Sequence, residues 1–278
     1  AFSDKNVWVK PFGSKTTQDD IDGVSGFDAN TYGIAVGVDG EYKDDRRAGI
    51  SFFYANSSVD TNNVTQSNDI QSFTLVGYGS NTIAKIDNSM LYYQVGYGIQ
   101  QNDSNRYIEL TSQNASADYT TKSIFASIKA TKEYKKSDKL TFIPEIGLNL
   151  SYFDSPNYTE TGAGGLNLQT NSFSANSLVA SIGNSLRYKK DENTDFTARA
   201  SLNYDLNNKA NSITSTYTGG GSSFTTEGLK NSSFGYEVGV GMSKELKENL
   251  TFDINYDLDG KGSEFKNHSV SAKFNLKF

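Results

Sequence analysis

The sequence has 278 residues, no cysteine and a net charge of −6, which excludes disulfides and thiolate metal sites and argues against binding driven by nucleic-acid phosphates. This length suffices for one large β domain or two small ones. A mean hydropathy of −0.56 and the lack of a long apolar run exclude transmembrane helices. They leave room for a membrane β-barrel, whose strands are apolar only at alternate positions.

The apolar residues predict about twelve strands, because side chains alternate between the two faces of a strand. Near the start of the chain, Tyr32, Ile34 and Val36 share one face, and Gly33 and Ala35 share the other. The clearest segments are, in chain order, residues 32–42, 91–100, 140–152, 178–188, 196–206, 234–242, 250–258 and 270–278. The alternation is less clear in residues 7–12 and 70–78, where apolar residues occupy both faces.

Short charged connections alternate with long polar ones. The short ones are residues 43–47, 135–138, 189–193 and 247–249, and the long ones, rich in Asn, Ser, Thr and Gly, are residues 14–30, 102–118, 154–171 and 207–231. A meander with short turns at one end is typical of outer-membrane barrels, whose periplasmic turns are short. We therefore predict an all-β fold: a twelve-stranded antiparallel transmembrane β-barrel with short periplasmic turns and long extracellular loops.

The polar faces of these strands carry Gly, Ser, Asn and Thr together with charges of both signs, a composition that suits a confined and hydrated lumen. The predicted lumen charges are Asp39, Glu41, Lys129, Glu145, Arg187, Arg199, Glu237 and Asp253. Arg187 and Arg199 fall on neighbouring strands, so we expect them to pair with Glu145 or Glu237 across the lumen. The same charges are also explained as wall residues that only satisfy one another, and the sequence does not separate the two interpretations.

The last segment is a strand that continues to the final residue. Phe274, Leu276 and Phe278 share its apolar face, and Lys273 and Lys277 lie on the other. A terminal apolar strand needs a partner on both sides, which a closed barrel provides. This ending resembles the assembly signal of Gram-negative outer-membrane proteins, and the resemblance implies insertion by the outer-membrane barrel assembly machinery.

No enzyme motif stands out, and we predict no catalytic residue, cofactor or metal. The only histidine, His268, falls on the outward face of the last strand, near the aqueous rim. Residues 257–264 share some spacing with a calcium loop but lack an oxygen ligand before the glycine, so we interpret them as a hairpin.

Five segments, taken in order, resemble the C-terminal translocator domain of monomeric type V autotransporters. They are Val7-Trp-Val-Lys-Pro-Phe-Gly13, Tyr32-Gly-Ile-Ala-Val-Gly-Val-Asp-Gly40, Ala48-Gly-Ile-Ser-Phe-Phe-Tyr-Ala55, Phe142-Ile-Pro-Glu-Ile-Gly-Leu148 and Lys273-Phe-Asn-Leu-Lys-Phe278. The resemblance implies a monomeric barrel in the outer-membrane lipid of a Gram-negative bacterium, assembled by that machinery, which anchors and secretes its own N-terminal passenger.

Residues 1–278 would then form one barrel domain, with residues 1–6 the remnant of a segment that links it to the passenger. No basic and apolar leader begins at Ala1, so we expect a mature product or a fragment. Family members carry a pore-threading helix before the first strand, which we expect to have been removed here. Some members cut their passenger with acidic lumen residues, but we interpret Glu237 and Asp253 as polar lining. A porin-like channel and a surface-adhesive barrel are the alternatives.

Overall fold

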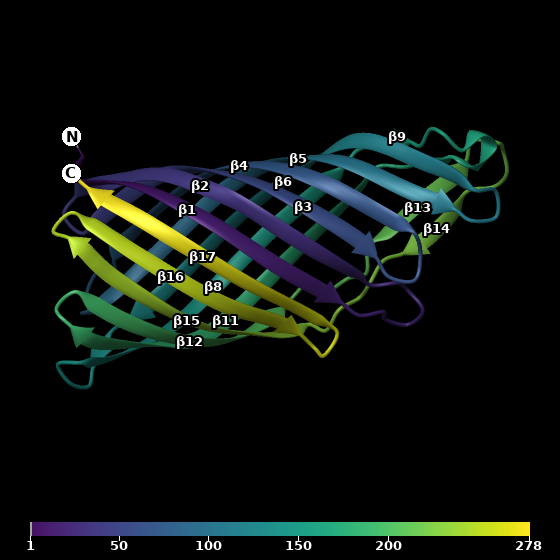
Figure 1. Cartoon of the computed structure of the whole chain (residues 1–278). Helices are drawn as coiled ribbons and strands as arrows, with labels where there is room; N and C mark the ends of the chain where they lie inside the picture. Colours follow the sequence, from purple (N-terminus) through teal and green to yellow (C-terminus); the bar gives the residue numbers. More distant parts are fainter. Residues whose placement is uncertain (1) are drawn as a thin grey trace.

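Twelve long strands wind into one closed antiparallel barrel in the computed structural model, which describes residues 2–278 (Figure 1). The barrel strands are β1 (Ser3–Gln18), β2 (Phe27–Lys43), β3 (Arg46–Thr61), β4 (Gln66–Thr82), β5 (Ser89–Ile108), β6 (Gln113–Lys132), β8 (Leu140–Ser155), β11 (Phe173–Asp191), β12 (Thr194–Asp205), β15 (Phe234–Lys247), β16 (Leu250–Lys261) and β17 (Phe265–Lys277). Each strand pairs with the next along the chain, and β1 closes the ring against β17, for instance through Val9 and Phe274. The predicted fold is confirmed.

Most large apolar side chains of the barrel point outward. Ile34 and Val36 on β2 are 44 % and 46 % exposed, whereas Ala35 between them is completely buried. The apolar face of β2 runs from Tyr42 to Tyr32, about 33 Å along the strand and about 25 Å along the axis at a tilt of about 40°. Large apolar residues that are exposed, with small residues buried between them, reverse the arrangement of a soluble protein and are typical of a wall that meets lipid. Residues 2–278 include no helix with the length and hydropathy of a membrane span.

The start of β1 and the C-terminus lie at the same end of the barrel, which we call the terminal end (Figure 1). The connections there are short: residues 44–45 join β2 to β3, 192–193 join β11 to β12, and 248–249 join β15 to β16. The charged connection between β6 and β8 also lies at this end and carries the short strand β7 (Tyr134–Lys135), which pairs with β8. The four connections predicted to be short therefore all lie at one end.

The opposite end, which we call the far end, is more ordered than the polar composition suggested. Residues 102–118, expected to be a loop, belong mostly to the β5–β6 hairpin, whose strands are 20 residues each. Of residues 14–30, only 19–26 lie outside β1 and β2. Polar side chains do not prevent the backbone of two strands from pairing. The polar composition of these segments therefore indicated contact with water and not an irregular backbone.

The two longest connections form a small sheet of their own at the far end. Its strands are β9 (Tyr158–Thr159), β10 (Leu168–Thr170), β13 (Ser212–Tyr217) and β14 (Phe224–Glu227), in the order β14-β13-β10-β9, with the 3-10 helix η1 (Gly164–Leu166) beside them. We call this unit the far lobe. It lies next to the overhanging β5–β6 hairpin (Figure 1).

Candidate functional site

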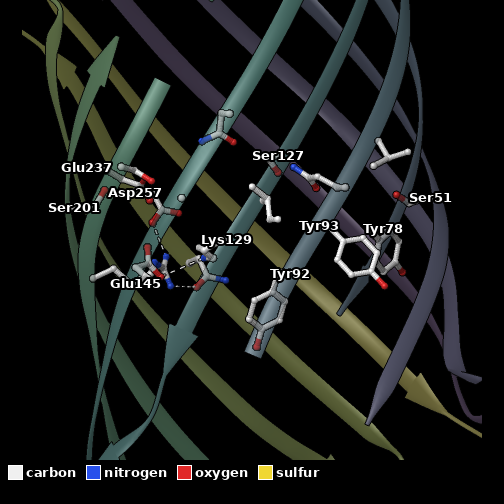
Figure 2. Close-up of a pocket in the computed structure, with 18 of the residues that line it drawn as sticks. Ser51, Tyr78, Tyr92, Tyr93, Ser127, Lys129, Glu145, Ser201, Glu237 and Asp257 are labelled. Atoms are coloured by element: carbon white, nitrogen blue, oxygen red, sulfur yellow. Dashed lines mark hydrogen bonds and ion pairs between the residues drawn. The ribbon is translucent and has the colours of Figure 1, made fainter. Parts of the chain in front are cut away.

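The barrel encloses a cavity of about 890 Å³ to which all twelve strands contribute (Figure 2). Alternation along each strand places every second side chain in this lumen. Of the predicted lumen charges, five line the cavity: Asp39, Lys129, Glu145, Arg199 and Glu237.

The other three predicted charges lie outside the cavity lining. Glu41 lies near the terminal end, where its Oε1 accepts a hydrogen bond from the backbone N–H of Asp45 at 3.1 Å. Asp253 shares a face of β16 with the cavity-lining Asp257 and stands opposite Lys273 in the neighbouring strand. The side chain of Arg187 turns toward the connection between β6 and β8.

The ion pairs run along the wall of the lumen. Lys129 on β6 pairs with Glu145 on the neighbouring β8, with 3.3 Å between Nζ and Oε2. Arg199 on β12 reaches Asp257 on β16, two strands away, at 2.5 Å. The centre of the lumen is therefore not bridged by these pairs.

The predicted ion-pair partners of Arg187 and Arg199 were wrong. Arg187 pairs with Glu133 at 3.1 Å, and Arg199 pairs with Asp257, so neither forms an ion pair with Glu145 or Glu237. Arg199 and Asp257 both stand directly opposite Gly239 on the intervening β15, and the absence of a side chain on this glycine leaves room for the two charged groups to meet.

An aromatic and charged cluster lies on the β1–β4 side of the lumen, and the sequence reasoning missed most of it. The Trp8 indole Nε1 donates to the Tyr78 hydroxyl at 2.7 Å, and that hydroxyl donates to Asp39 Oδ2 at 2.8 Å. Arg47 Nε also donates to the Asp39 carboxylate. Trp8 lies flat against Gly37, where a Cβ atom would come within 2.4 Å of the ring. Apolar residues on both faces of residues 7–12 hid this arrangement.

Two lysines that were not predicted from the sequence also contribute positive charge to the lumen. Lys10 and Lys273 line the cavity, and Lys273 Nζ lies 4.9 Å from the centre of the Trp8 ring, a cation–π contact. The lining then carries four cations, Lys10, Lys129, Arg199 and Lys273, and four anions, Asp39, Glu145, Glu237 and Asp257. A lumen lined by equal numbers of both signs is hydrated but has no strong preference for ions of one sign.

The final strand is paired on both sides. Phe274 and Leu276 project outward, and the backbone N–H of Phe278 donates to the Lys5 carbonyl at 2.9 Å. His268 also projects outward, and its Nδ1 lies 2.8 Å from the Tyr256 hydroxyl. Within residues 2–278, no three His, Cys, Asp or Glu side chains converge as a metal site would require.

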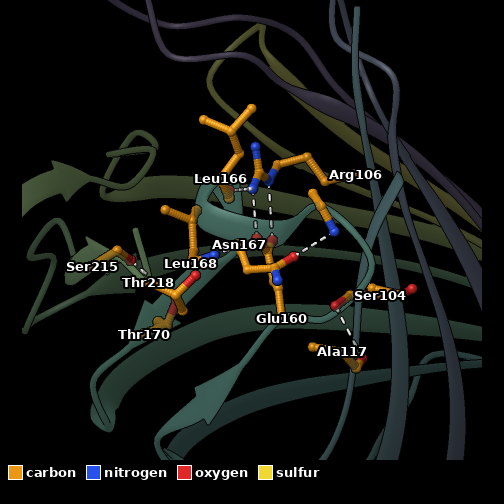
Figure 3. A network of polar contacts seen from close by, with 12 residues as sticks. Ser104, Arg106, Ala117, Glu160, Leu166, Asn167, Leu168, Thr170, Ser215 and Thr218 are labelled. Carbon is orange, nitrogen blue, oxygen red and sulfur yellow. Dashed lines mark hydrogen bonds and ion pairs between the residues drawn. The ribbon is translucent and has the colours of Figure 1, made fainter. Parts of the chain in front are cut away.

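A second polar network ties the far lobe to the overhanging hairpin (Figure 3). Arg106 on β5 binds Glu160 through two bonds, Nε to Oε1 at 3.0 Å and Nη2 to Oε2 at 2.5 Å, and it also donates to the Leu166 carbonyl at 3.0 Å. These bonds to the carboxylate raise the pKa of Arg106 above its ordinary value, which keeps the guanidinium charged. Tyr119 and Tyr158 stack beside it with 4.1 Å between ring centres.

Comparison with known proteins gives a consistent result. The family model for the autotransporter β-domain matches residues 7–257. Outer membrane protein A of Rickettsia conorii is 25 % identical over 98 % of this chain, which spans only 14 % of that relative's length.

Among solved structures, the translocator domain of the autotransporter NalP from Neisseria meningitidis superimposes with a TM-score of 0.81 at 17 % identity, covering 100 % of this chain and 90 % of that one. The β domain of the Bordetella autotransporter BrkA gives a TM-score of 0.67 at 12 % identity, with 99 % of each chain covered. These two likenesses are of fold.

Proposed function

This chain belongs to the autotransporter β-domain family, and we propose from that premise that its barrel secretes an N-terminal passenger to the cell surface. As a member of this family, the chain is an outer-membrane β-barrel of a Gram-negative bacterium, with the terminal end at the periplasm and the far end outside. The passenger is a proposal about a longer protein, because the chain spans a small part of its relatives.

The observation that carries the proposal is the arrangement of charge in the lumen. Lys129–Glu145 and Arg199–Asp257 are held along the wall, so the lining is polar while these ion pairs leave the middle of the cavity clear. A polypeptide in transit meets water and balanced charge instead of a sticky apolar surface. We propose that five predicted lumen charges and three that the sequence missed form this lining: Asp39, Lys129, Glu145, Arg199, Glu237, Lys10, Asp257 and Lys273. The remaining predicted charges, Glu41, Arg187 and Asp253, together with Arg47, continue the polar wall toward the terminal end.

We further propose that residues 1–278 form one domain, in which residues 1–6 link the barrel to the passenger. The barrel acts as a monomer and catalyses no reaction. Phe274, Leu276 and Phe278 supply the signal for the outer-membrane barrel assembly machinery. Their outward alternation and the pairing of Phe278 with Lys5 support this role.

The test begins with the unprocessed precursor, whose size and N-terminal sequence are measured. We expect a signal peptide followed by hundreds of residues before Ala1, as the length of the Rickettsia relative indicates. Protease added to intact cells should digest this upstream part only when the barrel is present. A signal peptide that ends at Ala1, with steady ion conductance in planar bilayers, would replace secretion with a porin-like channel.

A further inference from the structure

A second concave surface, of about 690 Å³, lies on the outside of the barrel, where β3 to β6 rise toward the far end. Four polar side chains cross it in one row, each paired directly with the next: Asn56, Gln71, Gln101 and Thr120. Tyr32 on β2, which is 66 % exposed, extends the row beside Asn56. We call this surface the outer groove.

The outer groove continues directly from the face that meets lipid. Leu75 and Ile99 are exposed apolar residues on the same strand faces as Gln71 and Gln101. The row next to the amides, toward the terminal end, is Ile34, Tyr54, Phe73 and Ile99, and it ends at the exposed Lys122. The change from apolar residues to amides within one step of the ladder marks the level at which acyl chains give way to head groups.

The two glutamine amides of the groove, those of Gln71 and Gln101, are free to bind a ligand. Hydrogen bonds on this face engage Asn56 (from Tyr54, 3.2 Å) and Asp69 (from Ser58, 2.7 Å), but within residues 2–278 none engages the side chain of Gln71 or Gln101. Each primary amide offers two donors and an acceptor, which match the paired donor and acceptor character of sugar hydroxyls. The exposed ring of Tyr32 offers the apolar face on which a sugar ring packs.

Three carboxylates form the next row outward. Asp69, Asp103 and Asp118 stand directly opposite one another across β4, β5 and β6. Carboxylates accept hydrogen bonds from hydroxyl groups but repel sulfated or carboxylated glycans at this level. A phosphate is accommodated only nearer the lipid, where Lys122 supplies a cation.

We propose that the outer groove binds the saccharide head group of a glycolipid of the outer leaflet. Its acyl chains lie against Phe73 and Ile99, its phosphate meets Lys122, and its hydroxyl-rich sugars occupy the amide row. The continuity of the groove with the lipid-facing wall favours a lipid-borne sugar over a soluble glycan. This inference does not depend on passenger secretion.

The test measures glycolipid binding by the full-length protein in detergent micelles, by native mass spectrometry and by titration. The probes are lipid A that carries a neutral oligosaccharide of hexoses and the same lipid A without it. We expect the sugar-bearing lipid to bind about tenfold more tightly, since each polar contact strengthens binding several-fold. The double variant Gln71→Ala, Gln101→Ala should bind both lipids alike, whereas the matched variant Gln169→Ala, at an exposed amide in the far lobe, should keep the preference.

Equal affinity of the unmodified protein for the two lipids would overturn the proposal, as would a preference that survives in the double variant. The free neutral oligosaccharide, if it bound as tightly as the whole glycolipid, would refute the commitment to a lipid ligand. If the double variant fails to assemble, as judged by heat-modifiable mobility on gels, Tyr32→Leu tests the same site. It keeps an apolar side chain, and it should reduce the sugar preference several-fold.

Discussion

Leu148 and Asn149 are adjacent on β8 and face opposite sides of the wall, so they offer a matched test of which side meets lipid. Leu148 is 45 % exposed between the equally outward Ile146 and Leu150, near the middle of the strand, whereas Asn149 lines the lumen. Arg near the bilayer midplane costs about 2–4 kcal/mol. Leu148→Arg should therefore shift the folding equilibrium in lipid by about 30- to 900-fold, since about 1.36 kcal/mol corresponds to a factor of ten.

Asn149→Arg should change that equilibrium much less, because the new cation enters a hydrated cavity of about 890 Å³. The assay is denaturant unfolding of the barrel in phospholipid vesicles. It can be followed by the fluorescence of Trp8, the single tryptophan, which is buried in the wall. Similar losses of stability in both variants would refute the assignment of the lipid and lumen faces.

Three other changes test particular contacts. Arg106→Ala removes two hydrogen bonds from a buried carboxylate and should destabilise the far lobe by about 3 kcal/mol, seen as faster hydrogen exchange in residues 158–170 with the barrel unaffected. Unchanged exchange there would contradict this role. Gly37→Ala places a methyl group against Trp8 and should cost about 1–3 kcal/mol with a shift in Trp8 emission, whereas Gly77→Ala, with no atom nearer than 4.0 Å, should do neither. Deleting Phe278 removes the last backbone bond of the seam and should slow assembly, measured as the rate at which the heat-modifiable form appears; an unchanged rate would argue against an assembly signal in this residue.

The sequence predicted the barrel well because alternation is a local signal. In β15, for example, Val238 and Val240 flank Gly239, and this pattern fixes which face each residue takes whatever the distant strands do. The other face then distinguishes a membrane wall from a soluble sheet, since its Gly, Ser, Asn and Thr residues and its charges of both signs suit a confined, hydrated lumen. The short charged turns follow from the same reasoning, as they separate two alternating runs.

The ion pairs could not be predicted in the same way, because they depend on which residues of different strands stand in register. Arg199 and Asp257 meet because the pairing of β12, β15 and β16 places both opposite Gly239, which has no side chain between them. The far lobe was hidden for another reason. Its strands β10 and β14 are three and four residues long, too short for alternation to be distinguished from a polar loop.

The seam between β1 and β17 sets the timing of biogenesis. Val9 and Phe274 come from opposite ends of the domain, so neither strand has its second neighbour until the ribosome has made nearly all of the chain. Until then the sheet has two open edges, whose unpaired N–H and C=O groups cannot enter hydrocarbon without a large cost. Insertion of this barrel is therefore a late event, and the chain must be kept unfolded and protected on its way to the membrane. Segments that pair early still have open edges and cannot insert into lipid by themselves. A protein truncated anywhere along the barrel is therefore expected to be degraded in the periplasm instead of being inserted in part.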